Sequence, residues 1–212
     1  MRGILINNSV HTGNKLGLVM TAKSLPAPTV KKDMVEIPGR NGALDMTEAL
    51  TGVPTYNNRS LSFSFVGDGS RAKVLELIDT LLLYHGQHIT IVVDDLEGWT
   101  YEGRAEVSYV DHYHYVEFEL VVDAQPFRYS AEQKQYSVSG VTSRSLVMEN
   151  TGFAVVPTVK VTASTTIKIG TDTYTISSGT YEDERLVLSN GNNTWVITST
   201  GTVTITFREA KI

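Results

Sequence analysis

The chain has 212 residues, of which 41% are hydrophobic. This length and composition predict a globular protein with room for one large or two small domains, each with its own core, and argue against a disordered chain. No apolar run approaches the roughly 18 residues of a bilayer-spanning helix, and the apolar stretch at residues 3–6 is too short for a secretory signal. We therefore expect a protein that is made in a cytoplasm and does not insert into a membrane.

The chain contains no cysteine, which excludes disulfides, thiolate metal sites and cysteine nucleophiles. Its net charge of −5 is unevenly placed, since residues 1–135 hold 12 Lys and Arg against 17 Asp and Glu, whereas residues 136–212 hold 6 of each. The sequence lacks the basic stripe that would neutralise a phosphate backbone. If DNA passes near this protein, an acidic lining would repel it and keep it from sticking.

The first distinctive segment is residues 37–45, a loop with several turn-forming residues that follows a candidate strand at residues 16–20. Pro38 fixes its own φ, while Gly39 and Gly42 permit positive φ on either side of Arg40. Arg40 is therefore expected at the apex of a bend, where its guanidinium can bind a carboxylate or carbonyl of another surface. The alternative is an ordinary hairpin turn with a solvated arginine.

Residues 61–65 alternate between apolar and polar and predict a strand. A helix is expected from Ser70, as the N-cap, to about His85, with Gly86 as a left-handed C-cap. A further strand, residues 88–93, follows. The apolar stripe expected to pack on a sheet comprises Val74, Leu75, Ile78, Leu81 and Leu82.

A meander follows the helix: a turn at 94–98, then strands at 99–104, 105–110 and 115–122. In the last of these Val116, Phe118, Leu120 and Val122 share one face, and Glu117 and Glu119 face the other side as solvated residues.

The composition changes near residues 127–129, after which Thr, Ser and Val dominate. Turns rich in Gly, Asn and Asp separate short strands, a pattern typical of a β-sandwich, and the strands are expected at 166–169, 174–176, 186–188, 195–197 and 203–207. The prediction is therefore a mainly β protein in two domains. Residues 1–135 form an α+β first domain, a β-sandwich with one packed helix, and residues 136–212 form a small β-sandwich.

Two clusters contain residue types that can support chemistry. His112 and His114 would share a face of an extended strand, where Asp111 or His88 could complete a metal site, but such a pair is more typical of a polar surface. The carboxylates at residues 94, 95 and 97 lack the spacing of a calcium loop and favour a hairpin turn. The sequence has no nucleophile elbow, phosphate loop or zinc-protease motif. We therefore expect no catalytic residue, no metal, no cofactor and no enzymatic activity.

Three segments together resemble siphophage distal tail proteins. The pattern Ile-Pro-Gly-Arg-Asn-Gly at 37–42, followed by Leu44-Asp45 and by Asn58-Arg59 leading into the strand at 61–65, resembles their first domain. The exit around Pro126 is similar to the end of that domain. Residues 150–161, Asn-Thr-Gly-Phe-Ala-Val-Val-Pro-Thr-Val-Lys-Val, resemble the start of their second domain, which is a galectin-like or jelly-roll β-sandwich.

The resemblance implies a homohexameric ring at the distal tail or baseplate of a virion, with a central channel through which DNA passes without specific binding. The implied partners are the tail tube protein, a tail-tip hub or tail-associated lysin, and a receptor-binding protein. The particle would be an infectious phage, a prophage remnant or a tail-like bacteriocin. It also implies subunit contacts through loops of the first domain, for which the candidates are Arg40, Asn41, Asn58 and Arg59, with inter-subunit ion pairs from Lys31, Lys32, Asp33 and Glu36.

Two alternatives remain open. A carbohydrate-binding module of a cell-surface adhesion apparatus would need exposed aromatic rings, for which the candidates are Tyr174, Tyr181 and Trp195. Trp195 lies in an alternating strand with Val196 and Ile197, which favours a core position. A glycan or peptidoglycan hydrolase would need two convergent carboxylates, and the sequence singles out no such pair.

Overall fold

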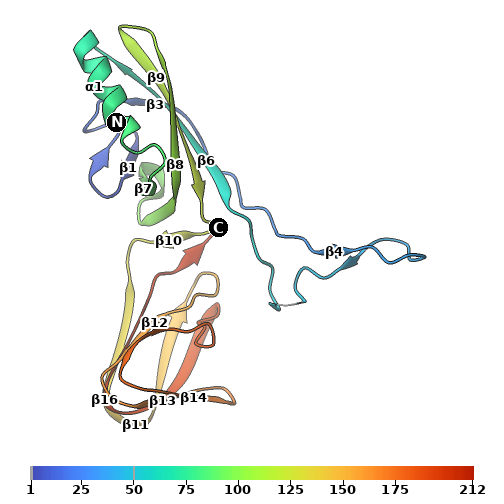
Figure 1. Ribbon diagram of the computed structural model, residues 1–212. Coiled ribbons are helices and arrows are strands. Elements are labelled where there is room, and N and C mark those ends of the chain that lie inside the picture. Colours follow the sequence, from blue (N-terminus) through green and yellow to red (C-terminus); the bar gives the residue numbers. More distant parts are fainter. Residues whose placement is uncertain (1, 50) are drawn as a thin grey trace. The chain divides into compact units, whose positions relative to one another are not determined.

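A computed structural model describes residues 2–49 and 51–212 (Figure 1). The chain divides into two compact units, one comprising the chain up to Arg128 together with Ile212 and the other comprising Tyr129–Lys211. Each has its own hydrophobic core. Within the residues described, no helix combines the length and the apolar character needed to cross a membrane.

An antiparallel sheet forms the body of the first unit. Its strands lie in the order β2-β1-β7-β8-β9-β6-β3. Their bounds are β1 Ile4–Ile6, β2 Val10–His11, β3 Val19–Ser24, β6 Arg59–Asp68, β7 His88–Val93, β8 Trp99–Asp111 and β9 Tyr115–Ala124. A short 3-10 helix, Asp94–Leu96, connects β7 to β8.

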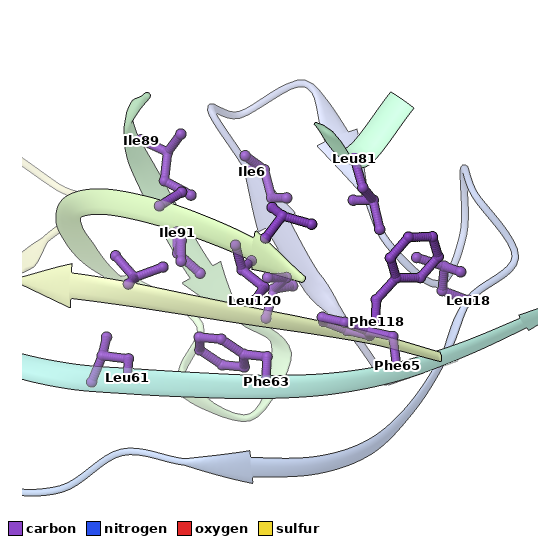
Figure 2. Packing of buried hydrophobic residues seen from close by; sticks show 14 of the residues in the cluster. Ile6, Leu18, Leu61, Phe63, Phe65, Leu81, Ile89, Ile91, Phe118 and Leu120 are labelled. Carbon is purple, nitrogen blue, oxygen red and sulfur yellow. The ribbon is translucent and has the colours of Figure 1, made fainter. Parts of the chain in front are cut away.

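Strict alternation along the strands decides which face of this sheet is buried. In β6, Leu61, Phe63 and Phe65 are buried, and in β9 the buried face is Val116, Phe118, Leu120 and Val122, as predicted. Figure 2 shows Leu61, Phe63, Phe65, Phe118 and Leu120 together with side chains from β1, β7 and α1 in one interior. Full burial of each large apolar side chain contributes about 1.5–3 kcal/mol.

The one α-helix of the described residues, α1, spans Arg71–Leu82 and packs on β6, β8 and β9. Ser70 caps its N-terminus as predicted, since the hydroxyl accepts from the Lys73 amide at 3.4 Å. The helix ends three residues earlier than expected; residues 83–86 form a turn, although Gly86 does adopt positive φ. The buried stripe is Val74, Leu77, Ile78 and Leu81, so the expectation for Leu75 and Leu82 was wrong and Leu77 was missed.

The second unit is also antiparallel and all-β. Two long strands, β11 (Lys134–Asn150) and β16 (Gly191–Phe207), pair along their length, and β16 pairs on its other side with β12 and β13. The remaining strands of this sheet are β12 Thr158–Val161, β13 Thr165–Ile169, β14 Asp172–Ile176 and β15 Gly179–Glu182. Two short strands, β10 Arg128–Ser130 and β17 Ala210–Lys211, pair with each other outside it. The core gathers around Trp195, which is 1% exposed.

Several expected strands take a different form. The predicted strands at 195–197 and 203–207 are parts of the single strand β16, and residues 186–188 contribute buried Leu186 and Leu188 without forming a strand. Leu188 makes only an isolated bridge to Val155. In the first unit the strand expected at 16–20 begins at Val19, with Leu18 buried just before it.

Candidate functional site

Residues 25–58, between β3 and β6, form a segment that we call the arm (Figure 1, at β4). Its two limbs run antiparallel: Val30 and Tyr56 form a bridge, the Lys31 amide donates to the Thr55 carbonyl at 2.8 Å, and the strands β4 (Met34–Val35) and β5 (Leu44–Asp45) pair further along. The pair β4–β5 is a sheet of its own.

The bend predicted at Arg40 is confirmed. Gly39 and Gly42 have φ of +83° and +75°, and the Arg40 amide donates to the Ile37 carbonyl at 3.1 Å. A β-carbon is disfavoured at such φ values, which explains why glycine occupies both positions. The tip borders an open hollow of about 400 Å³, lined by Glu36, Ile37, Pro38, Arg40, Gly42 and Ala43.

The arm exposes more large apolar side chains than a hairpin surrounded by water requires. Among the described residues of the arm, the exposed large apolar side chains are Val30, Met34, Val35, Ile37, Met46 and Val53. Contiguous exposed apolar surface marks interaction sites. The sequence prediction missed these side chains. They could have been noticed as apolar residues in a segment rich in Pro, Gly and Asn that has no neighbouring apolar segment to pack against.

Charged residues lie close to these apolar residues in the sequence. Within the part of the chain that the structure describes, Lys31, Lys32, Asp33, Glu36 and Arg40 form no ion pair, and all five are exposed. They remain available to groups outside this chain. The arm therefore combines exposed apolar side chains with charges that have no ion-pair partner in the described chain, a composition found in many protein interfaces.

The four residues predicted as subunit contacts do not lie together. Arg40 and Asn41 are exposed at the tip of the arm, whereas Asn58 is exposed at its root and its amide lies 3.4 Å from an Asp123 carboxylate oxygen. Arg59 corrects the prediction, because it is only 6% exposed. It is the first residue of β6 and shares the inward face with Leu61, so its guanidinium is not available at the surface.

The second face of the first sheet is polar and acidic. Glu117 and Glu119 point away from the core, as predicted, and with neighbouring side chains they line a hollow of about 560 Å³. Its other lining residues are Thr21, Ser64, Phe65, Val66, Ser108, Tyr109, Val110 and Phe118. A ligand or a channel on this side would meet negative charge.

The carboxylates of the turn after β7 bind separate partners. Asp94 accepts from the Gly3 amide at 2.7 Å and from His11 Nε2 at 3.0 Å, while Asp95 pairs with Lys23 and lies 3.6 Å from Arg2. Backbone amides of residues 13 and 14 donate to His11 Nδ1, which places the His11 proton on Nε2. This arrangement fastens the N-terminal hairpin to the sheet.

The two histidines considered for metal binding pack on different rings. His112 stacks on Tyr115 with ring centroids 4.3 Å apart, and His114 meets the edge of Tyr113 at 4.8 Å. Nowhere in residues 2–49 and 51–212 do three His, Asp or Glu side chains gather closely enough to hold a metal ion.

The aromatic residues of the second unit do not form an open platform. Trp195 is buried, as its alternating strand indicated, and so presents no ring face to a glycan. Tyr174 and Tyr181 are half-buried against the core, and the Arg185 guanidinium covers the Tyr174 ring at 5.5 Å.

Comparisons with known proteins identify the fold. No family model matches the sequence, and no curated protein matches it. Among solved structures, the Dit protein of phage SPP1, described as a hub adsorption apparatus of phages that infect Gram-positive bacteria, matches with a TM-score of 0.67 at 16% identity over 100% of both chains. A chain of the phage p2 baseplate in its activated conformation matches with a TM-score of 0.49 at 6% identity over 98% of both. The chain has the fold of a siphophage distal tail hub protein along its whole length, as the sequence resemblance indicated.

Proposed function

We propose that this protein is a structural component of a phage or phage-like tail, a distal tail hub that joins the tail tube to the tail tip or baseplate. The similarity of the whole chain to SPP1 Dit supports a tail role. The arm is the observation that carries the proposal, because a hairpin with an apolar surface and unpaired charges gains stability when another subunit covers it.

In this proposal six copies form a closed ring. The first unit of each copy abuts its neighbour through the arm, with Arg40 and Asn41 at the tip and Asn58 at the root as contacts. The free charges Lys31, Lys32, Asp33 and Glu36 are available for inter-subunit ion pairs. Ring contacts of this kind are heterologous and must close at a fixed rotation, so the bend at Gly39 and Gly42 matters more than any single charge.

The ring leaves a central channel for DNA. The acidic balance of residues 1–135 suits a lining that repels a phosphate backbone, and the acidic face with Glu117 and Glu119 is the part of the first unit best suited to that lining. The partners are the tail tube protein on one side and a tail-tip hub or tail-associated lysin on the other, with a receptor-binding protein attached to the assembly. The protein is made in the host cytoplasm and is located in the virion.

The second candidate is a carbohydrate-binding module, favoured only by the all-β character of the second unit. Two half-buried tyrosines, one of them under an arginine, offer a glycan little ring surface. A glycan array with the isolated chain separates the candidates, because the hub proposal does not require the second unit to bind sugar.

A charge reversal at Arg40 tests the role of the arm. Arg40→Glu is expected to impair ring assembly and to leave the circular dichroism unchanged, because Arg40 is exposed and makes no ion pair within the described chain. Arg144→Glu, at an exposed position of β11 in the second unit, is the matched control and should leave assembly unaffected. If Arg40→Glu assembled normally, the loop would be an ordinary turn with a solvated arginine and no role in assembly.

A further inference from the structure

At the root of the arm lies a buried arginine that the ring proposal does not use. Arg59 is only 6% exposed, and its guanidinium lies over the Tyr101 ring at 5.0 Å. Within the described residues, the guanidinium forms one hydrogen bond, and this is a long one, 3.4 Å from Nη1 to the Pro26 carbonyl. Nε and Nη2 are both buried and have no partner among the residues described.

A second arginine lies beside the first. The Arg128 guanidinium covers the Trp99 ring at 5.2 Å, and its Nε is also buried without a partner in the described chain. Trp99 and Tyr101 are two residues apart on β8, so their side chains leave the same face of the strand about 6–7 Å apart. The two guanidiniums are therefore neighbours over one face.

Neither guanidinium forms an ion pair with a carboxylate of the described residues. The surroundings are aromatic, since Tyr56 and Phe127 meet edge to face at 5.6 Å just before Arg59 and Arg128 in the sequence. Burial lowers the pKa of Arg59, an effect that Tyr101 opposes and the positive charge of Arg128 reinforces. A buried cation without a counter-charge is unfavourable, and aromatic faces compensate for only part of its lost hydration.

We propose that Arg59 and Arg128 form a binding site for one small anionic group, either a free oxyanion such as phosphate or a carboxylate. An anion between them would accept from the unpartnered N–H groups and would neutralise two adjacent positive charges. Guanidinium groups suit this role because their fork of donors fits the oxygens of carboxylate and phosphate. The proposal does not depend on ring assembly.

The test is titration of the full chain with inorganic phosphate, and separately with acetate, while sodium chloride holds the ionic strength constant. Saturable binding is expected by calorimetry, with a rise in Tm. Arg59→Gln and Arg128→Gln should each weaken binding about ten- to hundredfold, as expected for the loss of a charged hydrogen-bonding partner. Arg104→Gln, an exposed arginine of β8 that donates to the Gly86 carbonyl, is the control and should bind as the unaltered chain does.

Arg128→Gln keeps the test valid if Arg59→Gln does not fold, because Arg128 is only half-buried. Sedimentation with and without phosphate then separates the sources of the anion. Phosphate that weakens self-association points to a carboxylate of a second copy, and unchanged association points to a free ion. Absence of saturable binding for both anions, or equal affinity in the unaltered chain and Arg128→Gln, would overturn the proposal.

Discussion

Asn150 is a fully buried polar residue whose amide group holds together three parts of the second unit. Its Nδ2 donates to the carbonyls of Phe153 at 2.8 Å and Leu188 at 3.0 Å, and its Oδ1 accepts from the Gly152 amide at 3.0 Å. In the sequence, Asn150 belongs to the segment that resembles the start of the second domain. The contacts explain why an amide side chain is needed here, because only Asn and Gln supply two N–H donors and a carbonyl acceptor from one group.

Asn150→Ala is expected to lower the free energy of unfolding of the second unit by about 3 kcal/mol, because buried carbonyls and an amide lose their partner. The measurement is chemical denaturation followed by Trp195 fluorescence in a Trp99→Phe background. Asn192→Ala, at an exposed position of β16, is the control and should change stability by less than about 0.5 kcal/mol. Equal effects of the two changes would contradict this role.

Glu209 links Lys134 to Thr151 across the same unit. Lys134 Nζ lies 2.6 Å from Oε1, which also accepts from the Thr151 amide at 2.9 Å, while the Thr151 hydroxyl donates to Oε2 at 2.8 Å. Partial burial alone would raise the pKa of Glu209, but these hydrogen bonds outweigh it and lower the pKa from 4.5 to about 2.

A carboxyl group whose pKa is lower in the folded than in the unfolded state stabilises the fold at pH values above its unfolded-state pKa. This stabilisation is lost as the pH falls through its folded-state pKa. Glu209 should therefore contribute on the order of 2 kcal/mol at neutral pH, after allowance for the partly exposed Lys134, and this should be lost between pH 4.5 and about 2. In denaturation series over this range, Glu209→Gln should be less stable at neutral pH and should lose less on acidification. An unchanged acid profile in Glu209→Gln would exclude the contribution.

At the scale of elements, two leucines of α1 test which face of the helix packs against the sheet. Leu77 is 1% exposed and lies over Gly67 of β6 together with Leu18, whereas Leu75 is 44% exposed. Leu77→Ala should lower the free energy of unfolding of the first unit by about 3 kcal/mol, and Leu75→Ala by less than about 0.5 kcal/mol. Scanning calorimetry checks this, and similar losses for the two would mean that the helix is rotated relative to the sheet.

The elements that depend on local pattern could be predicted from the sequence. The N-cap at Ser70, the alternation in β9 and the glycine bend around Arg40 each follow from neighbouring residues, and the structure confirms them. The phase of the helix was harder to predict, because residues 74–75 and 81–82 are two pairs of adjacent apolar residues, and in each pair both members compete for one inward position. Leu77 packs over Gly67, and this contact, which fixes the phase of the helix, is not local.

Long strands with interior glycines were harder still. The sequence predicts separate strands at 195–197 and 203–207, but Gly201 lies within the single strand β16, where a β-carbon would come within 2.5 Å of the Thr162 hydroxyl. Glycine occupies position 201 because a neighbouring segment comes close to the backbone, and not because the chain turns there. The burial of Arg59 was not expected because the strand predicted at 61–65 stops short of it, whereas β6 begins at Arg59 and places it on the same face as Leu61.

At the scale of the whole molecule, two separate cores serve two units of different composition. The first carries the helix, the arm and the acidic face, and the second is an all-β unit with Trp195 at its centre. In the proposed ring, the arm of the first unit contacts the neighbouring subunit and the acidic face of the same unit lines the channel. Assembly then accounts for both the exposed apolar side chains of the arm and the net charge of −5.

The most direct test of this account is the mass of the purified protein in solution by light scattering, together with negative-stain images. The account predicts a species of six chains, each of 23.3 kDa, that appears as a ring with a central opening. Arg40→Glu should shift that species toward single chains, and Arg144→Glu should not. A protein that stays strictly monomeric at high concentration under every salt condition, with no rings in the images, would contradict it.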